Sequence, residues 1–299
     1  MDNETALVPR GAALPRIAAR WSRTLWLFTK RNPVGAFGGL IIVMLLLVAL
    51  LADVITPFRY DEFNIPERLQ SPSWNHLFGT DNQGRDVFSR VVYGARTSVY
   101  TGFGALALTT VVATGIGMYS AYYGGIVDLV FQRVVDIWQA FPGLIFVIFV
   151  VAIAGPSTTT LIIVIGLLFA SRSSRLVRSQ ALAIKAQPYT ESARVIGASN
   201  SRIIFFHILP NVVPIILISA SVQIGAVILL ESSLAFLGYG TPPPIPSWGR
   251  MLQEAQRDTL SNPHLAIFPG LAIALVVYAF NMFGDALRDA IDPRMRGSK

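Results

Sequence analysis

Five stretches without a charged residue constrain the fold of this chain more than any other feature. A helix needs roughly 18–20 apolar residues to cross the ~30 Å hydrocarbon core of a bilayer. The five stretches are long enough, with 19, 31, 35, 28 and 26 residues at 34–52, 97–127, 137–171, 203–230 and 259–284. Lipid offers backbone amides no water to bind, so spanning segments of this kind form helices. The sequence therefore predicts an all-α integral membrane protein.

The 35-residue stretch is too long for one crossing, because a single helix of that length would measure about 52 Å. Gly155 and Pro156 interrupt it near its middle, and Pro142 is expected to kink the helix that precedes this break. The prediction is six transmembrane helices, at about 34–54, 98–122, 129–154, 158–177, 211–232 and 266–285.

The distribution of Lys and Arg predicts the orientation. Sixteen of them lie before the first predicted helix, from residue 172 to the fifth helix, and after the sixth, whereas seven lie in 53–96 and 238–265. Positive loops stay in the cytoplasm, so both termini and 178–210 are predicted to be cytoplasmic. This bias accounts for the net charge of +7. No basic stripe with interleaved aromatic residues suggests a nucleic-acid partner.

Motifs of enzymes are absent from the sequence. It contains no G-x-x-x-x-G-K-[ST] phosphate loop, no H-E-x-x-H zinc motif and no G-x-S-x-G nucleophile elbow. It has no cysteine, which excludes disulfides and thiolate chemistry. We therefore expect a protein that is not an enzyme and that holds no metal or cofactor of its own.

A few charged residues fall inside the predicted helices. Arg133 and Asp136 are three residues apart and can pair on one helix face. Glu231 lies at the outer end of the fifth helix. Charges at membrane depth are costly and often functional. The alternative is a structural ion pair near the interface and a solvated glutamate, and the sequence leaves both interpretations open.

Both outer loops contain residues that favour tight turns or stiff backbone. In the first, Gly79 and Gly84 are turn residues, and Asp81 or Asp86 can cap a following helix. A short interfacial helix over 86–96 is expected to lead into the second spanning helix. In the second, four prolines within 242–246 favour a stiff extended chain, which either docks a soluble partner or simply ends the fifth helix.

The segment 188–210 is too polar for lipid and too regular for an idle linker. Pro188 suits the first turn of a helix, and Glu191 can pair with Arg194. Gly197 costs about 1 kcal/mol relative to alanine inside a helix, a cost tolerated where the chain turns or another backbone approaches closely.

The residues around this glycine predict a helix–turn–helix elbow at the cytoplasmic face. Ala193, Ile196 and Gly197 are expected to form a small, flat patch. A second short helix is expected to begin at Arg202 and to end at Pro210, where the fifth spanning helix follows.

The pattern E-S-A-x3-G at 191–197, followed by I-L-P at 208–210, resembles the EAA loop of ABC-importer permease subunits. Nearly the whole chain resembles the second, C-type permease of dipeptide, oligopeptide and nickel importers, through the stretches 76–98, 134–142, 230–252 and 268–296. Two positions depart from the wider pattern. Ser192 is a small substitution, and His207 replaces an apolar residue in a form similar to that of the peptide subfamily.

The resemblance implies a type I ABC importer permease fold with six transmembrane helices and a cytoplasmic EAA coupling loop at 188–210. It implies a multi-pass protein of a bacterial or archaeal inner membrane. The implied partners are a sister permease, two ABC ATPase subunits or domains that bind ATP and Mg, an extracytoplasmic substrate-binding protein, and membrane lipid. The implied divisions are a cytoplasmic segment 1–33, a first helix 34–54, an extracytoplasmic loop 55–97, a core permease domain 98–290 and a cytoplasmic tail 291–299.

Two sets of residues become candidate sites through the resemblance. The ATPase-coupling set is Glu191, Ser192, Ala193, Gly197, Ala198 and Ser199. The set for docking the binding protein is Asp81, Gly84, Arg85, Asp86, Pro243 and Trp248. Di- or oligopeptides are the expected substrates, and nickel or another small solute is the alternative. A secondary transporter without an ATPase is the rival class, and inverted repeats with ion-coupling groups would favour it.

Overall fold

The computed structural model describes residues 29–30 and 32–291. Nearly all of the segments 1–33 and 291–299 therefore lies outside the described residues. Within the described ranges the chain is helical, and its β-structure is one isolated bridge between Thr80 and Asp86. The predicted all-α class is confirmed.

Five helices are long and apolar enough to cross a membrane within the described part of the chain. They are α2 (Pro33–Leu50), α4 (Val87–Tyr123), α7 (Thr158–Lys185), α10 (Leu209–Phe236) and α12 (His264–Ile291). The shorter elements are α3 (Ala52–Ile55), η1 (Ile65–Glu67), α5 (Gly125–Ala140), α6 (Gly143–Ala154), α8 (Pro188–Val195), α9 (Asn200–Arg202), the π-helical η2 (Ile203–Ile208) and α11 (Trp248–Ala255).

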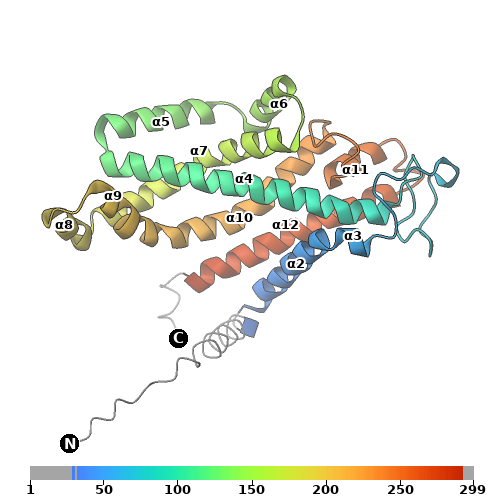
Figure 1. Cartoon of the computed structure of the whole chain (residues 1–299), viewed down its shortest axis with the longest axis horizontal. Helices are drawn as coiled ribbons and strands as arrows, with labels where there is room; N and C mark the ends of the chain where they lie inside the picture. The colour runs from blue at the N-terminus through green and yellow to red at the C-terminus, as the bar shows by residue number, and fades with distance from the viewer. Residues whose placement is uncertain (1–28, 31, 292–299) are drawn as a thin grey trace, which may run out of the picture.

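The sixth crossing is made by α5 and α6 together. They meet at an 88° bend, so the kink expected near Pro142 is present and is sharp. Proline disfavours helical backbone in the residue before it, and Phe141 is accordingly extended, with φ −87° and ψ 136°. α5 begins beside the end of α4, and α6 leads to the start of α7 well along the molecule from there, so the bent pair returns the chain toward the opposite side (Figure 1). The prediction of six crossings is confirmed in this form.

The long helices lie side by side along the longest axis (Figure 1). α7 packs along α4, α10 contacts α4, α7 and α12, and α2 packs on α12. Small residues allow the α2–α12 contact, because a Cβ added at Gly35 would lie 2.0 Å from the Cβ of Ala286, and one at Gly38 would lie 2.6 Å from the carbonyl oxygen of Ala279.

Helix α4 differs from the prediction at its start. It runs without a break from Val87, so the separate interfacial helix expected over 86–96 is wrong. The side chain of Asp86 accepts a hydrogen bond of 2.7 Å from the backbone N–H of Ser89, which confirms Asp86 as the cap. Nothing after this cap interrupts the helix, so the amphipathic stretch and the membrane span are one element.

Pro210 does not end a helix, contrary to expectation. Residues 200–236 form one continuous helical span. The π-helical η2 lies directly before the proline, and the N–H of Leu209 bonds to the carbonyl of Ile204, five residues back. A wider turn of this kind accommodates the proline, which lacks an N–H and crowds the preceding turn of an α-helix.

The two ends of the molecule have different elements. α8 and α9 lie at one end, and α2 begins and α12 ends on the side of the molecule nearer to them (Figure 1). α3, α11 and the segment 56–86 lie at the other end. Successive spans therefore alternate in direction, as a chain that crosses a membrane six times requires.

Candidate functional site

The elbow, residues 188–210, turns sharply at Gly197. The N–H of Gly197 bonds to the carbonyl of Arg194 and that of Ala198 to Ala193, both at 3.0 Å. This pair of bonds is the Schellman motif, which requires a left-handed residue after the helix. Gly197 supplies it with φ +83°, and no atom lies within 4 Å of an added Cβ. Of the two reasons predicted for this glycine, the turn is the one that applies.

The elbow exposes only part of the predicted coupling set. Glu191, Ser192, Gly197 and Ser199 are exposed, and Ala198 is half-buried.

Ala193 is buried, so the flat patch predicted with Ile196 and Gly197 does not form. Ala193 packs in a cluster that includes Tyr122 and Val177. Ile196 points away from it because it occupies the C-cap, where the chain leaves α8.

The predicted Glu191–Arg194 ion pair is absent from the described structure. The guanidinium of Arg194 lies instead over the ring of Tyr122, 6.0 Å from its centre, within the range of a cation–π interaction.

Large apolar side chains on the elbow are exposed, which the sequence pattern had not predicted, although Ile196 was expected in the flat patch. Val195 and Ile196 are each 83% exposed and Phe206 is 75% exposed, although the surrounding segment is polar. Phe206 also lines a groove of about 550 Å³, together with Ser199, Ser201, Arg202, Phe205 and His207. Exposed apolar clusters of this kind mark contact surfaces. The signal in the sequence was a pair of aliphatic residues directly before the turn glycine.

At the opposite end, four charged residues form a buried cluster, which we call the outer ion cluster: Asp81, Arg85, Arg90 and Glu254. Arg85 bonds to Asp81 at 2.7 Å and to Glu254 at 2.8 Å, and Arg90 bonds to Glu254 at 2.9 Å and also to Asp81. The cluster joins the segment 56–86 to α4 and α11. A third guanidinium, that of Arg250, pairs with Glu254 at 3.2 Å, so each buried carboxylate is paired with more than one cation, and buried charges need such partners.

Most of the predicted docking residues are buried and cannot present their side chains to a partner. Asp81 and Arg85 belong to the outer ion cluster, and Asp86 caps α4 and bonds to Nδ1 of His76 at 2.9 Å. Gly84, with φ +74°, packs so closely that an added Cβ would lie 1.8 Å from the carbonyl oxygen of Asn64.

Trp248 is also buried, whereas Pro243 is exposed. The indole Nε1 of Trp248 donates to the carbonyl oxygen of Val91 at 2.9 Å, which fixes α11 against α4. Trp248 is therefore a buried structural residue that stabilises the outer end of the molecule. Of the six predicted docking residues, Pro243 is the one whose exposure fits the role.

The outer ion cluster makes the stability of this end depend on pH. Burial alone would raise the pKa of Glu254, but the charges of Arg90 and Arg85 outweigh it and hold the pKa below the ordinary 4.5. A depressed pKa contributes stability that is complete above the unfolded value and is lost as the pH falls through the folded value. We therefore expect the thermal stability of the outer end to fall as the pH drops below 4.5.

Limited proteolysis of 56–86 across pH 7 to 3 measures this loss. Glu254→Gln should be cleaved faster at pH 7 and should show a flatter pH dependence. Glu62→Gln is the matched control, because Glu62 is exposed on the same segment and forms no ion pair among the described residues. Equal pH profiles for the wild type and Glu254→Gln would contradict the expectation.

The charged residues inside the helices are in different surroundings. Arg133 lies 3.7 Å from Asp136, which also bonds to Arg175 of α7, and all three are exposed. Arg133 and Asp136 therefore form the structural ion pair that was one of the two interpretations of the sequence. Glu231 is 1% exposed and its carboxylate lies 3.4 Å from the Ser232 hydroxyl, so the alternative of a solvated glutamate is wrong.

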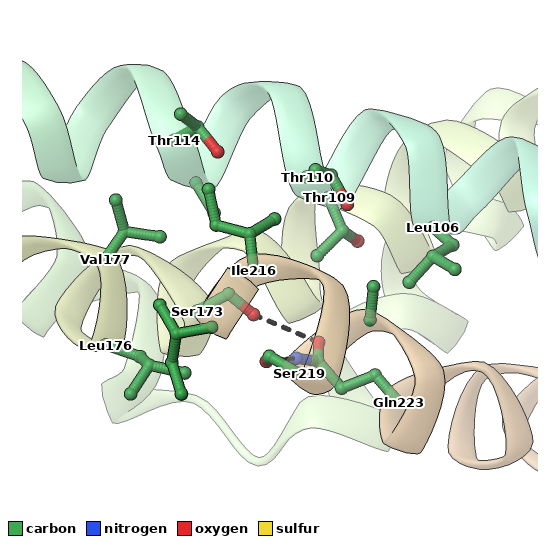
Figure 2. Close-up of a pocket in the computed structure, with 13 residues that line it drawn as sticks. Leu106, Thr109, Thr110, Thr114, Ser173, Leu176, Val177, Ile216, Ser219 and Gln223 are labelled. Atoms are coloured by element: carbon green, nitrogen blue, oxygen red, sulfur yellow. Dashed lines mark hydrogen bonds between the residues drawn. The ribbon is translucent and has the colours of Figure 1, made fainter. Parts of the chain in front are cut away.

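A polar seam runs between α4, α7 and α10 in the middle of the helices (Figure 2). Ser173 donates to the side-chain oxygen of Gln223 at 3.0 Å, and Thr109 donates to the carbonyl of Gly166 at 2.9 Å. The enclosed space is about 20 Å³, enough for about one water molecule. Small-ligand sites need roughly 300 Å³ or more, so this space is too small to hold a peptide.

A larger groove of about 740 Å³ lies on the surface of α10, α11 and α12. Its walls are mainly apolar, with Ser232, Ser233, Tyr278 and Asn281 adding polar atoms. It is open on one side, so a ligand bound there would need a second wall from another subunit.

Comparisons with known proteins agree with this arrangement. Residues 113–297 match the family described as binding-protein-dependent transport system inner membrane component, and residues 20–72 match the N-terminal TM domain of oligopeptide transport permease C. The first match covers the end of α4, the elbow and the last span. The chain belongs to this family. It is a multi-pass inner-membrane permease.

Curated relatives extend over nearly the whole chain. The permease is 42% identical to the dipeptide transport system permease protein DppC of Alkalihalophilus pseudofirmus, over 89% of this chain and 88% of that protein. It is 39% identical to the glutathione transport system permease protein GsiD of Escherichia coli, over 95% of this chain and 96% of that protein.

Two solved structures share the fold. An inward-facing structure of the MetNI methionine ABC transporter matches with a TM-score of 0.55 and 18% identity, over 68% of this chain and 96% of that one. An amino acid ABC transporter determined with histidines matches with a TM-score of 0.54 and 13% identity, over 68% and 95%. Both are ABC transporters, which confirms the predicted permease fold.

Proposed function

We propose that this permease is one half of the membrane pathway of an ATP-driven importer of small peptides. The observation that carries the proposal is the elbow, a turned helix pair with exposed apolar side chains inside the matched family region. The sequence has no phosphate loop, so ATP and Mg belong on two separate ATPase subunits or domains. The chain itself then performs no hydrolysis.

The elbow is the proposed contact with an ATPase subunit. Glu191, Ser192 and Ser199 supply polar side chains to that surface, Gly197 and Ala198 supply the turn between them, and Val195 with Ile196 supply an exposed apolar centre. An apolar centre with a polar rim is the usual composition of a protein interface. Ala193 supports the surface from inside and does not touch the partner. The elbow and both termini are then cytoplasmic.

The groove on α10, α11 and α12 is the proposed wall of the translocation pathway, with a sister permease supplying the opposite wall. The proposed divisions of the chain follow from this role: cytoplasmic segments at 1–33 and 291–299, a first helix at 34–54, an extracytoplasmic loop at 55–97 and a core at 98–290. A substrate-binding protein would dock at the outer end, where Pro243 and its neighbours 242–245 are exposed.

Short peptides are the proposed substrates because the names of the relatives specify a dipeptide and glutathione, which is itself a small peptide. The apolar groove with isolated serine, tyrosine and asparagine side chains suits a ligand whose side chains vary. Nickel or another small solute is the alternative within the same class of importer.

The test is to purify the permease with its associated subunits and to measure ATP hydrolysis and peptide uptake in proteoliposomes. We expect an ATPase to copurify, and di- or tripeptides with the binding protein to stimulate both hydrolysis and uptake. Uptake without ATP and without a copurifying ATPase would instead establish a secondary transporter. Stimulation by a nickel chelate and not by peptides would retain the importer and change its substrate.

A further inference from the structure

Three transmembrane helices reach the elbow, and they are joined to it differently. α7 continues into α8 through two residues, Ala186 and Gln187, and the elbow continues into α10 as one helical span. α4 has no such covalent connection, because it ends at Tyr123 and the chain then turns into α5. Any force between the elbow and α4 must therefore pass through noncovalent contacts.

Tyr122, in the last turn of α4, makes a noncovalent polar contact between α4 and the elbow. Its hydroxyl donates to the side-chain oxygen of Asn200 at 2.7 Å. Within the described part of the chain this is the one hydrogen bond between α4 and the elbow. Asn200 is the first residue of α9, directly after the Gly197 turn and the capping Ser199, so the bond reaches the point at which the elbow changes direction.

Two cations hold the Tyr122 ring in place. The Lys185 ammonium lies 5.7 Å from the ring centre and the Arg194 guanidinium 6.0 Å from it. Lys185 also donates to the carbonyl oxygens of Ala121 at 3.1 Å and Tyr122 at 2.6 Å. The last residue of α7 therefore caps the end of α4, and the tyrosine is 7% exposed. A buried ring held by these contacts can transmit a displacement of the elbow to α4.

A second set of bonds joins α5 to the same ends. Asp128 of α5 accepts from Nε of Arg178 in α7 at 2.6 Å and also from the Ser120 hydroxyl of α4. The ends of α4, α5 and α7 are thus tied to one another close to the elbow. A displacement of Tyr122 is therefore transmitted to the ends of all three helices.

We propose that Tyr122 is a positioning residue for transport, which couples movement of the elbow to α4 through its bond to Asn200. This inference rests on the proposed function. Without the bond, movement of the elbow still reaches α7 and α10 through the chain, but α4 follows it less completely. ATP hydrolysis then continues while less peptide is moved per ATP.

Tyr122→Phe is the sharpest test, because it keeps the ring, its packing and its cation–π contacts and removes only the hydroxyl. One hydrogen bond changes an equilibrium by roughly two- to tenfold, so we expect uptake per ATP hydrolysed to fall about two- to tenfold. Assembly with the ATPase and basal hydrolysis should be retained. The ratio of uptake to hydrolysis is decisive, because loss of folded protein lowers both quantities together.

The adjacent tyrosine provides the matched control. Tyr123 is 48% exposed and forms ring contacts with Tyr119 and Tyr122 but no side-chain hydrogen bond among the described residues. Tyr123→Phe should transport like the wild type. Asn200→Ala should reproduce the Tyr122→Phe defect, and the double variant should be no worse than either single variant, because both remove the same bond.

The outcomes separate this inference from the proposed function. A wild-type complex that shows ATP-driven uptake, together with a Tyr122→Phe ratio equal to wild type, overturns the role of Tyr122 alone. Additive defects in the double variant also overturn it, since they would mean that the two residues act independently. A wild-type preparation without ATP-driven uptake overturns the proposed function itself.

Discussion

Replacing Gly197 by aspartate is expected to reduce ATP-driven uptake at least about tenfold while the permease still inserts and assembles. Gly197 has φ +83° and free space around it, so the new side chain meets no steric obstacle. A left-handed backbone costs a non-glycine residue roughly 1–2 kcal/mol, and aspartate is among the residues that tolerate it best. The fold should therefore survive, while a second negative charge joins Glu191 on the proposed ATPase-binding surface.

Gly197→Asn is the matched control for this variant. Asparagine and aspartate are nearly equal in size and both tolerate a left-handed backbone, so the backbone cost at Gly197, with φ +83°, is similar for the two variants. The added negative charge is then the difference between them. Uptake and peptide-stimulated hydrolysis in proteoliposomes should fall further for Gly197→Asp than for Gly197→Asn. Normal uptake by Gly197→Asp would refute the elbow as the coupling element, and equal losses in the two variants would refute the role of the added charge.

The sequence predicted the membrane helices well because the free energy of lipid transfer is summed over long apolar runs. The breaks at Pro142 and Gly155 were also predicted, since each follows from local backbone chemistry. The exact helix ends were not. α4 begins eleven residues before the predicted start and α7 ends eight after the predicted end, because both extend beyond the apolar segment that defined the prediction.

The candidate sites were predicted less completely, and the errors have a common cause. Asp81, Arg85 and Asp86 are polar residues in an outer loop, and the prediction equated polarity with exposure. Asp81 and Arg85 are buried in a cluster with Glu254, which is 169 positions from Arg85, and Asp86 is buried against His76. No local pattern reveals such a pairing. Ala193 was misplaced for a related reason, since its burial depends on Tyr122 in a distant helix.

The outer ion cluster should be the most sensitive stabilising feature outside the membrane, and Arg90→Met is the variant expected to show this. Arg90 is 2% exposed and contacts both Asp81 and Glu254. Methionine keeps most of the apolar packing and removes the charge. Removing one partner from a buried ionic group costs about 3–5 kcal/mol, because the remaining charges are left uncompensated. Arg85 and Arg250 still offset part of the negative charge, so we expect the lower end of that range.

Arg59→Met is the control, because Arg59 pairs with Asp61 on the surface of the same segment, with its side chain 78% exposed. Solvent-exposed pairs of this kind contribute little, so that variant should melt like the wild type. The abundance and melting temperature of the purified permease should fall for Arg90→Met alone. Similar melting of the two variants would mean that packing around Trp248, and not the ion cluster, attaches 56–86 to α4 and α11. Loss of the cluster would displace the surface proposed for the binding protein, so peptide-stimulated uptake should fall even in molecules that remain folded.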